Sequence, residues 1–176
     1  AKISGKIFFK IIANFYTTVV RGIPELLVIY LIFFGGSAGI MYLSKIFGYN
    51  GYIELNAFTM GTISIGIISA AYSTEVFRGS YNIIDKGQFE AARSLGLSKI
   101  NTFIKVLAPQ ILKHALPGLG NVWQITLKDT ALISVTGLVE IMRQSRIAAN
   151  VTHSPLTFYL SAAVLYLILT TFSSKA

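Results

Sequence analysis

The chain has 176 residues, of which 53% are hydrophobic and 12% are charged. Soluble globular domains carry about 25% charged residues, so this composition excludes an ordinary soluble domain and indicates a membrane protein. The formal net charge of +8 does not indicate nucleic acid as a partner, because the basic residues are spread between apolar runs and do not alternate with aromatic residues.

Several kinds of functional site are disfavoured by residue type. The chain has no Cys, which excludes disulfides, thiol catalysis and Cys-ligated metal. His114 and His153 are far apart in sequence and are better explained as loop residues than as metal ligands. Gly118 and Gly120 lack the further glycine and the βαβ context of a nucleotide-binding loop and are better explained by helix packing. We therefore expect no cofactor or metal in this chain and no enzymatic activity.

Residues 6–21 have the spacing of an amphipathic helix. Polar residues recur every three or four positions from Lys6 to Arg21, while apolar residues such as Phe15 occupy the other face. The pattern predicts a helix that lies on the membrane surface; the alternative is the start of a long transmembrane helix. Because the sequence opens in this segment without Met, we expect it to be truncated at the N-terminus, and its short final apolar run indicates truncation at the C-terminus as well.

Four apolar runs are predicted to span the membrane. They have about 17–22 residues, and at 1.5 Å per residue a helix needs about 20 to cross roughly 30 Å of hydrocarbon. Gly35 and Gly36 are expected to loosen the first run, and Pro117 to occupy the first turn of the third. Polar residues predict connecting loops at 45–56 and 140–154. The predicted spans are residues 23–43, 57–76, 117–138 and 156–172.

Small residues recur every four positions in the second run, at Gly66, Ala70 and Thr74. Such a strip lets another helix approach closely where lipid provides no hydrophobic driving force. The serines of this run are likewise interpreted as packing residues, because no base or paired carboxylate accompanies them as in a hydrolase.

The distribution of Lys and Arg predicts the orientation. Eleven of the 15 basic residues lie on one side of the predicted spans, three lie on the other side, and Lys128 lies within a span. Because cytoplasmic loops are rich in Lys and Arg, the long loop 78–114 is predicted to be cytoplasmic, together with the N-terminal flank and the C-terminus.

The loop 78–114 has signals for two helices joined by a tight turn. Asp85, followed three residues later by Gln88, is a capping-box-like pattern for a helix over 86–95, and Gly96 can adopt the left-handed conformation that ends it.

Ser98 can cap the second helix of this pair, which has apolar residues at three- and four-residue spacing and which Pro109 is expected to terminate. The result is a helix-turn-helix that projects into the cytoplasm. One alternative is a solvated loop ordered by its own caps. The other, a DNA-binding element, is disfavoured by the few basic residues on the second helix.

The same loop resembles the Glu-Ala-Ala loop of bacterial ATP-binding-cassette (ABC) importer permeases. In that motif a Gly follows four residues after the second Ala, and an Ile-x-Leu-Pro lies further on. The matching residues are Glu90, Ala91, Ala92, Gly96 and Pro109. Val106 and Ala108 stand where the family usually has Ile and Leu. The segments 21–27, 74–79, 115–121 and 127–132 are also similar to the polar amino acid branch, most closely to its histidine, arginine and opine members.

The resemblance implies an all-α membrane protein with part of the type I importer permease fold, as a single permease domain over residues 1–176. It implies about four transmembrane helices, an interfacial helix and a cytoplasmic coupling helix. The implied function is the membrane-spanning subunit of an ATP-driven importer of a polar or basic amino acid or opine. The alternatives are import of another solute and a non-transporting anchoring or assembly subunit.

The resemblance also implies the partners and the location. ABC ATPase subunits would bind ATP and Mg²⁺ and dock the helix that carries Glu90, Ala91, Ala92 and Gly96. A second permease subunit, identical or related, would complete the path, and a periplasmic or lipid-anchored binding protein would deliver the substrate. The chain is expected in the bacterial inner membrane, in contact with lipid, with a cytoplasmic C-terminus and no nucleic acid partner.

Charged residues within the third predicted run indicate a candidate substrate pathway. A charge at the bilayer centre costs at least about 2.5 kcal/mol and usually faces protein or water. Asp129 beside Lys128, together with Glu75, could meet a cationic substrate, with Trp123 and Gln124 lining the path. The alternative is that these charges form structural ion pairs that fix helix packing.

Overall fold

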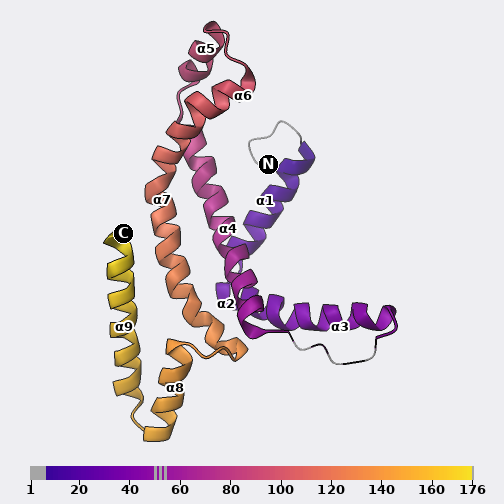
Figure 1. Cartoon of the computed structure of the whole chain (residues 1–176), viewed down its shortest axis with the longest axis vertical. Helices are drawn as coiled ribbons and strands as arrows, with labels where there is room; N and C mark the ends of the chain where they lie inside the picture. The colour runs from indigo at the N-terminus through magenta and orange to yellow at the C-terminus, as the bar shows by residue number, and fades with distance from the viewer. Residues whose placement is uncertain (1–6, 50, 52, 54, 176) are drawn as a thin grey trace. The chain divides into compact units, whose positions relative to one another are not determined.

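The computed structural model describes residues 7–49, 51, 53 and 55–175, and these residues form helices and no strands (Figure 1). The all-α prediction is therefore confirmed. The chain divides into two compact units, residues 1–19 with 70–122 and residues 20–69 with 123–176. The long helices α4 (Ala57–Ile83) and α7 (Ala108–Asp129) contribute to both units. The single-domain assignment stays a prediction.

The first unit contains most of α1 and the predicted coupling loop. The amphipathic helix α1 spans Ile7–Gly22, so the predicted helix is confirmed, although Lys6 lies outside the described residues. Its apolar face is exposed, with Phe15 at 70% exposure. Such an exposed apolar face is consistent with a helix that lies in a membrane surface, which stays a prediction.

The coupling loop of this unit consists of α5 (Lys86–Ser94), α6 (Lys99–Thr102) and a π-helical segment η2 (Phe103–Leu107) that leads into α7. Figure 1 shows α5 and α6 together at the ends of α4 and α7. A small apolar core joins α4, α5, η2 and α7, and its residues are Ile84, Leu107 and Ile111 with Tyr81, Phe89 and Val106 packed against them.

The prediction that Pro109 ends the second helix is wrong. Helical structure continues from Lys99 through Pro109 to Asp129. The π-helical segment explains this, because the N–H of Ala108 already bonds the carbonyl of Phe103, five residues back. The register of the backbone hydrogen bonds therefore changes next to Pro109, which has no N–H to donate.

Pro117 was expected in the first turn of a helix but lies inside α7. The helix begins earlier than predicted because the coupling loop runs directly into it. One missing backbone hydrogen bond within a helix is tolerated in membrane proteins, where neighbouring groups compensate.

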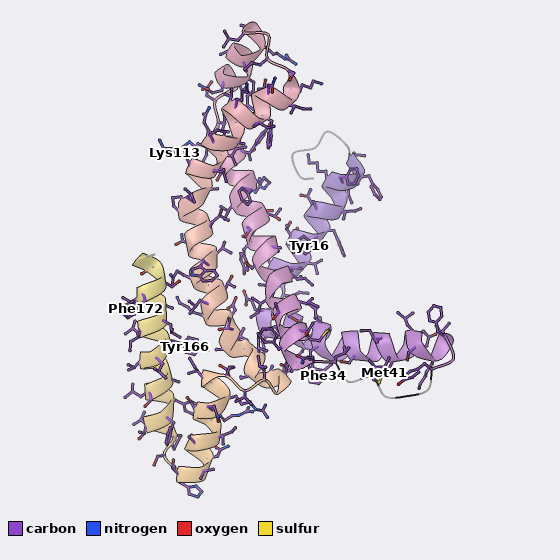
Figure 2. All side chains as sticks on the ribbon, viewed as in Figure 1. Tyr16, Phe34, Met41, Lys113, Tyr166 and Phe172 are labelled. Atoms are coloured by element: carbon purple, nitrogen blue, oxygen red, sulfur yellow. The ribbon has the colours of Figure 1, made fainter. Side chains whose placement is uncertain are left out.

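The second unit begins with a helical run formed by α2 (Glu25–Tyr30), the π-helical segment η1 (Leu31–Gly35) and α3 (Gly36–Ile46). Pro24 precedes it, and its carbonyl accepts hydrogen bonds from the N–H groups of Leu27 and Val28. The predicted loosening at the glycine pair corresponds to the π-helical turn that ends at Gly35. Figure 2 labels Phe34 and Met41 on this run.

The third predicted run, 117–138, is not one α-helix. It becomes the 3-10 segment η3 (Thr130–Thr136) after Asp129 and ends at Gly137, which has a left-handed φ of 96°. The hydroxyls of Thr130 and Thr136 each bond the carbonyl three residues back, at 2.7 and 2.8 Å. These side chains and the β-branched residues between them favour the tighter helix.

A helix not predicted from the sequence, α8 (Ile141–Thr152), occupies the predicted loop 140–154 and forms an antiparallel hairpin with α9 (Pro155–Lys175) (Figure 1). Glu140 caps α8, and its carboxylate accepts from the N–H groups of Met142 and Arg143 at 2.7 and 2.6 Å. Tyr166 of α9, labelled in Figure 2, donates its hydroxyl to Glu140 at 3.2 Å. Glu140 therefore joins the two helices.

Two helical segments among the described residues are long and apolar enough to cross a membrane, Glu25–Ile46 and Pro155–Ser174. They correspond to the first and last predicted spans. The second and third spans stay predictions; α4 continues to Ile83, beyond the predicted end of the second span.

The small-residue strip predicted on α4 does not pack within the described chain. Gly66 and Ala70 are exposed, and a Cβ at Gly66 would meet open space. The buried face of α4 is the opposite one, with Ser64, Ile68 and Ala71. The buried face also carries small residues, Ser64 and Ala71, so small residues occur on both faces of α4 and their spacing alone does not identify the packed one.

Candidate functional site

The helix α5, which carries the Glu-Ala-Ala sequence, is fixed at its N-terminus by Asp85. The side chain of Asp85 accepts a hydrogen bond from the N–H of Gly87 at 2.6 Å, so the predicted cap is confirmed. Gln88 does not complete a capping box. Its side-chain oxygen instead accepts from Nε2 of Gln110 on α7 at 3.2 Å, which ties α5 to the neighbouring helix.

The turn after α5 has the predicted left-handed glycine. Gly96 has a φ of +69°. Its N–H bonds the carbonyl of Arg93 at 2.9 Å, and the N–H of Leu97 bonds the carbonyl of Ala92 at 3.1 Å. This pair of bonds is the Schellman pattern that ends helices at glycine. A residue with a Cβ would be strained at this φ, so the turn depends on Gly96.

The predicted coupling residues on α5 lie on two faces. Glu90 and Ala91 are exposed, whereas Ala92 is buried with 3% exposure. The helical spacing explains the division, because Ala92 follows Phe89 by three residues and shares its inward face. Glu90 and Ala91 are therefore available to a partner, while Ala92 supports the fold of the loop.

The second helix of the loop exposes apolar residues that a solvated loop would not need. Ser98 caps α6 by accepting from the N–H of Asn101 at 3.3 Å, as predicted. Leu95, Ile100 and Ile104 are 78%, 71% and 60% exposed. Glu90 and Ala91 are exposed as well, and these five exposed residues are named the outer face of the loop. Exposed apolar groups of this kind mark interaction surfaces.

Glu75 forms an ion pair within its own helix. Its carboxylate lies 2.7 Å from both Nε and Nη2 of Arg78, one turn further along α4. The Glu75 side chain is 14% exposed and that of Arg78 is 46% exposed. The structural ion pair considered from the sequence is therefore present at Glu75, whose place in a substrate pathway stays a prediction.

Asp129 is the last residue of α7, where the third predicted span changes to the 3-10 segment η3, and its depth in a membrane stays a prediction. It is half-buried, while Lys128 is exposed. The carboxylate of Glu25, at the start of α2 in the same unit, interacts electrostatically with that of Asp129. Two carboxylates from different helices of one unit therefore repel each other, an interaction that sequence spacing does not reveal.

Trp123 and Gln124 contact α9. The indole N–H of Trp123 donates to the hydroxyl of Ser173, and Nε2 of Gln124 donates to the carbonyl of Thr170 at 3.4 Å. These bonds hold the second half of α7 against α9 within one unit. Whether the two residues also line a substrate path stays a prediction.

Comparison with known proteins extends these observations to nearly the whole chain. Residues 2–175 match the family described as the binding-protein-dependent transport system inner membrane component. The chain is 47% identical over 176 residues to the octopine transport system permease protein of Rhizobium meliloti, covering 100% of this chain and 74% of that protein.

Two further similarities have comparable coverage. The chain is 36% identical over 173 residues to the histidine/lysine/arginine/ornithine transport system permease protein of Escherichia coli K12, covering 98% of this chain and 73% of that protein. It is also similar to a crystal structure of an amino acid ABC transporter with histidines, with a TM-score of 0.82 and 34% identity. That match covers 99% of this chain and 76% of the other.

Proposed function

The chain belongs to the family of binding-protein-dependent transport system inner membrane components, and on that premise we propose that it imports a polar or basic amino acid or an opine by coupling to separate ATPase subunits. It is a membrane permease subunit of an importer with the all-α type I permease fold. The proposal concerns its substrate, its partners and the residues that perform the coupling.

The outer face of the helix pair carries the coupling proposal. Glu90 and Ala91 on α5 and Leu95, Ile100 and Ile104 beyond it are exposed in one unit. Apolar side chains on a basic cytoplasmic loop need a protein partner to leave water. We propose that this face docks on an ATPase subunit.

ATP and Mg²⁺ bind in that partner under this proposal, and this chain supplies no nucleotide-binding residue. Closure of two ATPase subunits moves the docked helix α5. The turn at Gly96, the capped start at Asp85 and the bond between Gln88 and Gln110 make the helix pair rigid. A rigid pair transmits the movement to α4 and α7 instead of absorbing it.

The proposed substrate class rests on similarity and on the acidic residues of the second unit. The relatives named above are an octopine permease and a histidine/lysine/arginine/ornithine permease. The carboxylates of Asp129 and Glu25 interact electrostatically. A cationic side chain is attracted to such a pair, because it relieves the repulsion between the two negative charges.

The orientation and the remaining partners complete the proposal. The coupling loop and the C-terminus face the cytoplasm, α8 faces the outside, and a binding protein delivers the substrate there. The strip of Gly66, Ala70 and Thr74 on α4, in which Gly66 and Ala70 are exposed and Thr74 is half-buried, is a close-packing surface for a second permease subunit.

Cysteine cross-linking tests the docking directly, because the chain has no native Cys. Ala91→Cys places a thiol on the outer face of α5, and Asn150→Cys places one at an exposed position of α8. We expect a reagent with one thiol-reactive and one amine-reactive end to join the Ala91→Cys thiol to lysine amines of the ATPase subunit in the assembled complex, and not the Asn150→Cys thiol. Cross-linking at both positions or at neither would refute the docking proposal.

A further inference from the structure

A groove lies within the coupling loop, and none of its lining residues belongs to the outer face. It has a volume of about 770 Å³ and is formed by residues of one unit, from the end of α4, from α5 and from the α6–η2–α7 run. Its lining residues are Phe77, Tyr81, Phe89, Arg93, Leu97, Lys99, Thr102, Phe103, Leu107 and Ile111. Most of these side chains are apolar.

The groove is open to solvent and is not enclosed within the apolar core. Phe77 and Phe103 in its walls are 38% and 52% exposed, although Leu107 and Ile111 at its base are buried. Aromatic groups exposed in a concave surface leave unfavourable contact with water, which an apolar occupant removes.

Two cations and no carboxylate line the groove. Arg93 projects from α5 and Lys99 from the start of α6. Within the described part of the chain neither side chain forms an ion pair. The surrounding loop 78–114 has six Lys and Arg against two Asp and Glu. The field at the groove therefore attracts an anion.

The groove is separate from the proposed docking face. On α5 the groove residues Phe89 and Arg93 are four positions apart and share one side, whereas Ala91 lies on the opposite side and Glu90, three positions before Arg93, lies between the two. A partner centred on Ala91 therefore docks on the side of α5 away from the groove.

We propose that this groove binds one acidic phospholipid of the cytoplasmic leaflet. An acyl chain occupies the aromatic part of the groove, and the phosphate group lies between Arg93 and Lys99. A free phosphate would not account for the apolar lining, and a neutral lipid would not account for the two cations. Basic sites beside membrane-spanning helices on the cytoplasmic side have this chemistry.

The position of the groove along the chain agrees with this occupant, given the proposed orientation. Phe77 comes directly after the second predicted span, and Ile111 precedes the third. The groove therefore lies at the depth where acyl chains meet headgroups on the cytoplasmic side. A lipid bound there would contact α4, α5 and α7 together.

Fluorescence quenching by brominated lipid tests the proposal on the full chain in vesicles. Trp123 is the single Trp, so the double variant Trp123→Phe, Phe103→Trp moves the only reporter into the groove. Vesicles of phosphatidylcholine contain a small fraction of either brominated phosphatidylglycerol or brominated phosphatidylcholine. Because each cation near the surface contributes about 1 kcal/mol, we expect the groove reporter to prefer the acidic lipid by about 5- to 30-fold. The unmodified Trp123 reporter should show a ratio near 1.

Paired variants identify the cause of the preference. Arg93→Gln with Lys99→Gln should reduce the ratio to near 1. Lys86→Gln with Lys113→Gln removes the same charge from exposed positions outside the lining and should keep it. Arg93→Lys with Lys99→Arg keeps the charge and should also keep the preference, with circular dichroism verifying the fold of each variant.

Three results would overturn the proposal. The first is a groove reporter with no preference for the acidic lipid, and the second is an equal loss in both glutamine pairs. The third is a reporter that no brominated lipid quenches, which would mean that protein covers the groove. None of these results depends on ATPase coupling, so failure here is distinguishable from failure of the proposed function.

Discussion

Replacing Gly118 by Ala tests a close helix contact beneath the coupling loop. A Cβ at Gly118 on α7 would lie 2.7 Å from Cγ1 and 3.2 Å from Cγ2 of Val76 on α4. Carbon atoms in contact normally lie about 3.5–4.0 Å apart. Val76 cannot turn away, because a β-branched side chain in a helix keeps one rotamer about 90% of the time. The two helices must therefore move apart, or Val76 must become strained.

The expected magnitude follows from two opposing effects. Overpacking costs about 1–3 kcal/mol, while Ala in place of Gly within a helix returns about 1 kcal/mol. Gly120→Ala is the matched control, since a Cβ there would meet no atom within 4 Å. Gly118→Ala should therefore lower the free energy of unfolding by about 1–3 kcal/mol relative to Gly120→Ala. At about 2–4 °C per kcal/mol, Tm should differ by several degrees.

The assay is thermal unfolding of the purified chain in detergent, followed by far-ultraviolet circular dichroism. Val76→Ala removes both methyl groups that a Cβ at position 118 would meet. Combined with Gly118→Ala, it should recover most of the lost stability relative to Val76→Ala alone, as expected for directly coupled positions. Equal melting of the Gly118 and Gly120 variants, or no recovery in the double variant, would refute the reasoning.

Three further predictions concern caps and charges. Asp85→Ala should destabilise α5 by about 1 kcal/mol, seen as faster amide hydrogen exchange over residues 86–94, whereas Asp85→Ser should not. Tyr166→Phe should lower the free energy of unfolding by about 0.5–1.5 kcal/mol, because the hydrogen bond to Glu140 is lost. Glu140→Ala should lower it further, because two backbone N–H groups of α8 also lose their acceptor. Equal melting temperatures of the two variants would contradict this. Asp129→Asn should abolish uptake of a cationic substrate at normal membrane levels, and unchanged uptake would remove Asp129 from the pathway.

Local signals predicted the coupling loop because its structure depends on near neighbours. The cap at Asp85, the left-handed turn at Gly96 and the cap at Ser98 each involve residues within a few positions. The same reasoning failed at Pro109, where a π-helical segment accommodates the proline. A shift of hydrogen-bond register has no simple signature in residue type.

Features that depend on distant residues were not predicted. Glu140 caps α8 and also accepts from Tyr166, and Asp129 interacts electrostatically with Glu25 through the arrangement of several helices. The burial of Ala92 beside exposed Ala91 likewise depends on what packs against α5. Motif spacing identifies such residues, but the tertiary contacts decide which of them a partner can reach.

The most direct test of the central claim is ATP hydrolysis by the chain reconstituted in lipid with its candidate ATPase and binding protein. The binding protein is loaded in turn with arginine, histidine, lysine, glutamine or octopine. We predict that one ligand stimulates hydrolysis and that Gly96→Asp abolishes the stimulation, because the turn at φ +69° is strained by any Cβ. Failure of the ATPase to co-purify with the chain, or stimulation that survives Gly96→Asp, would contradict coupling through this loop.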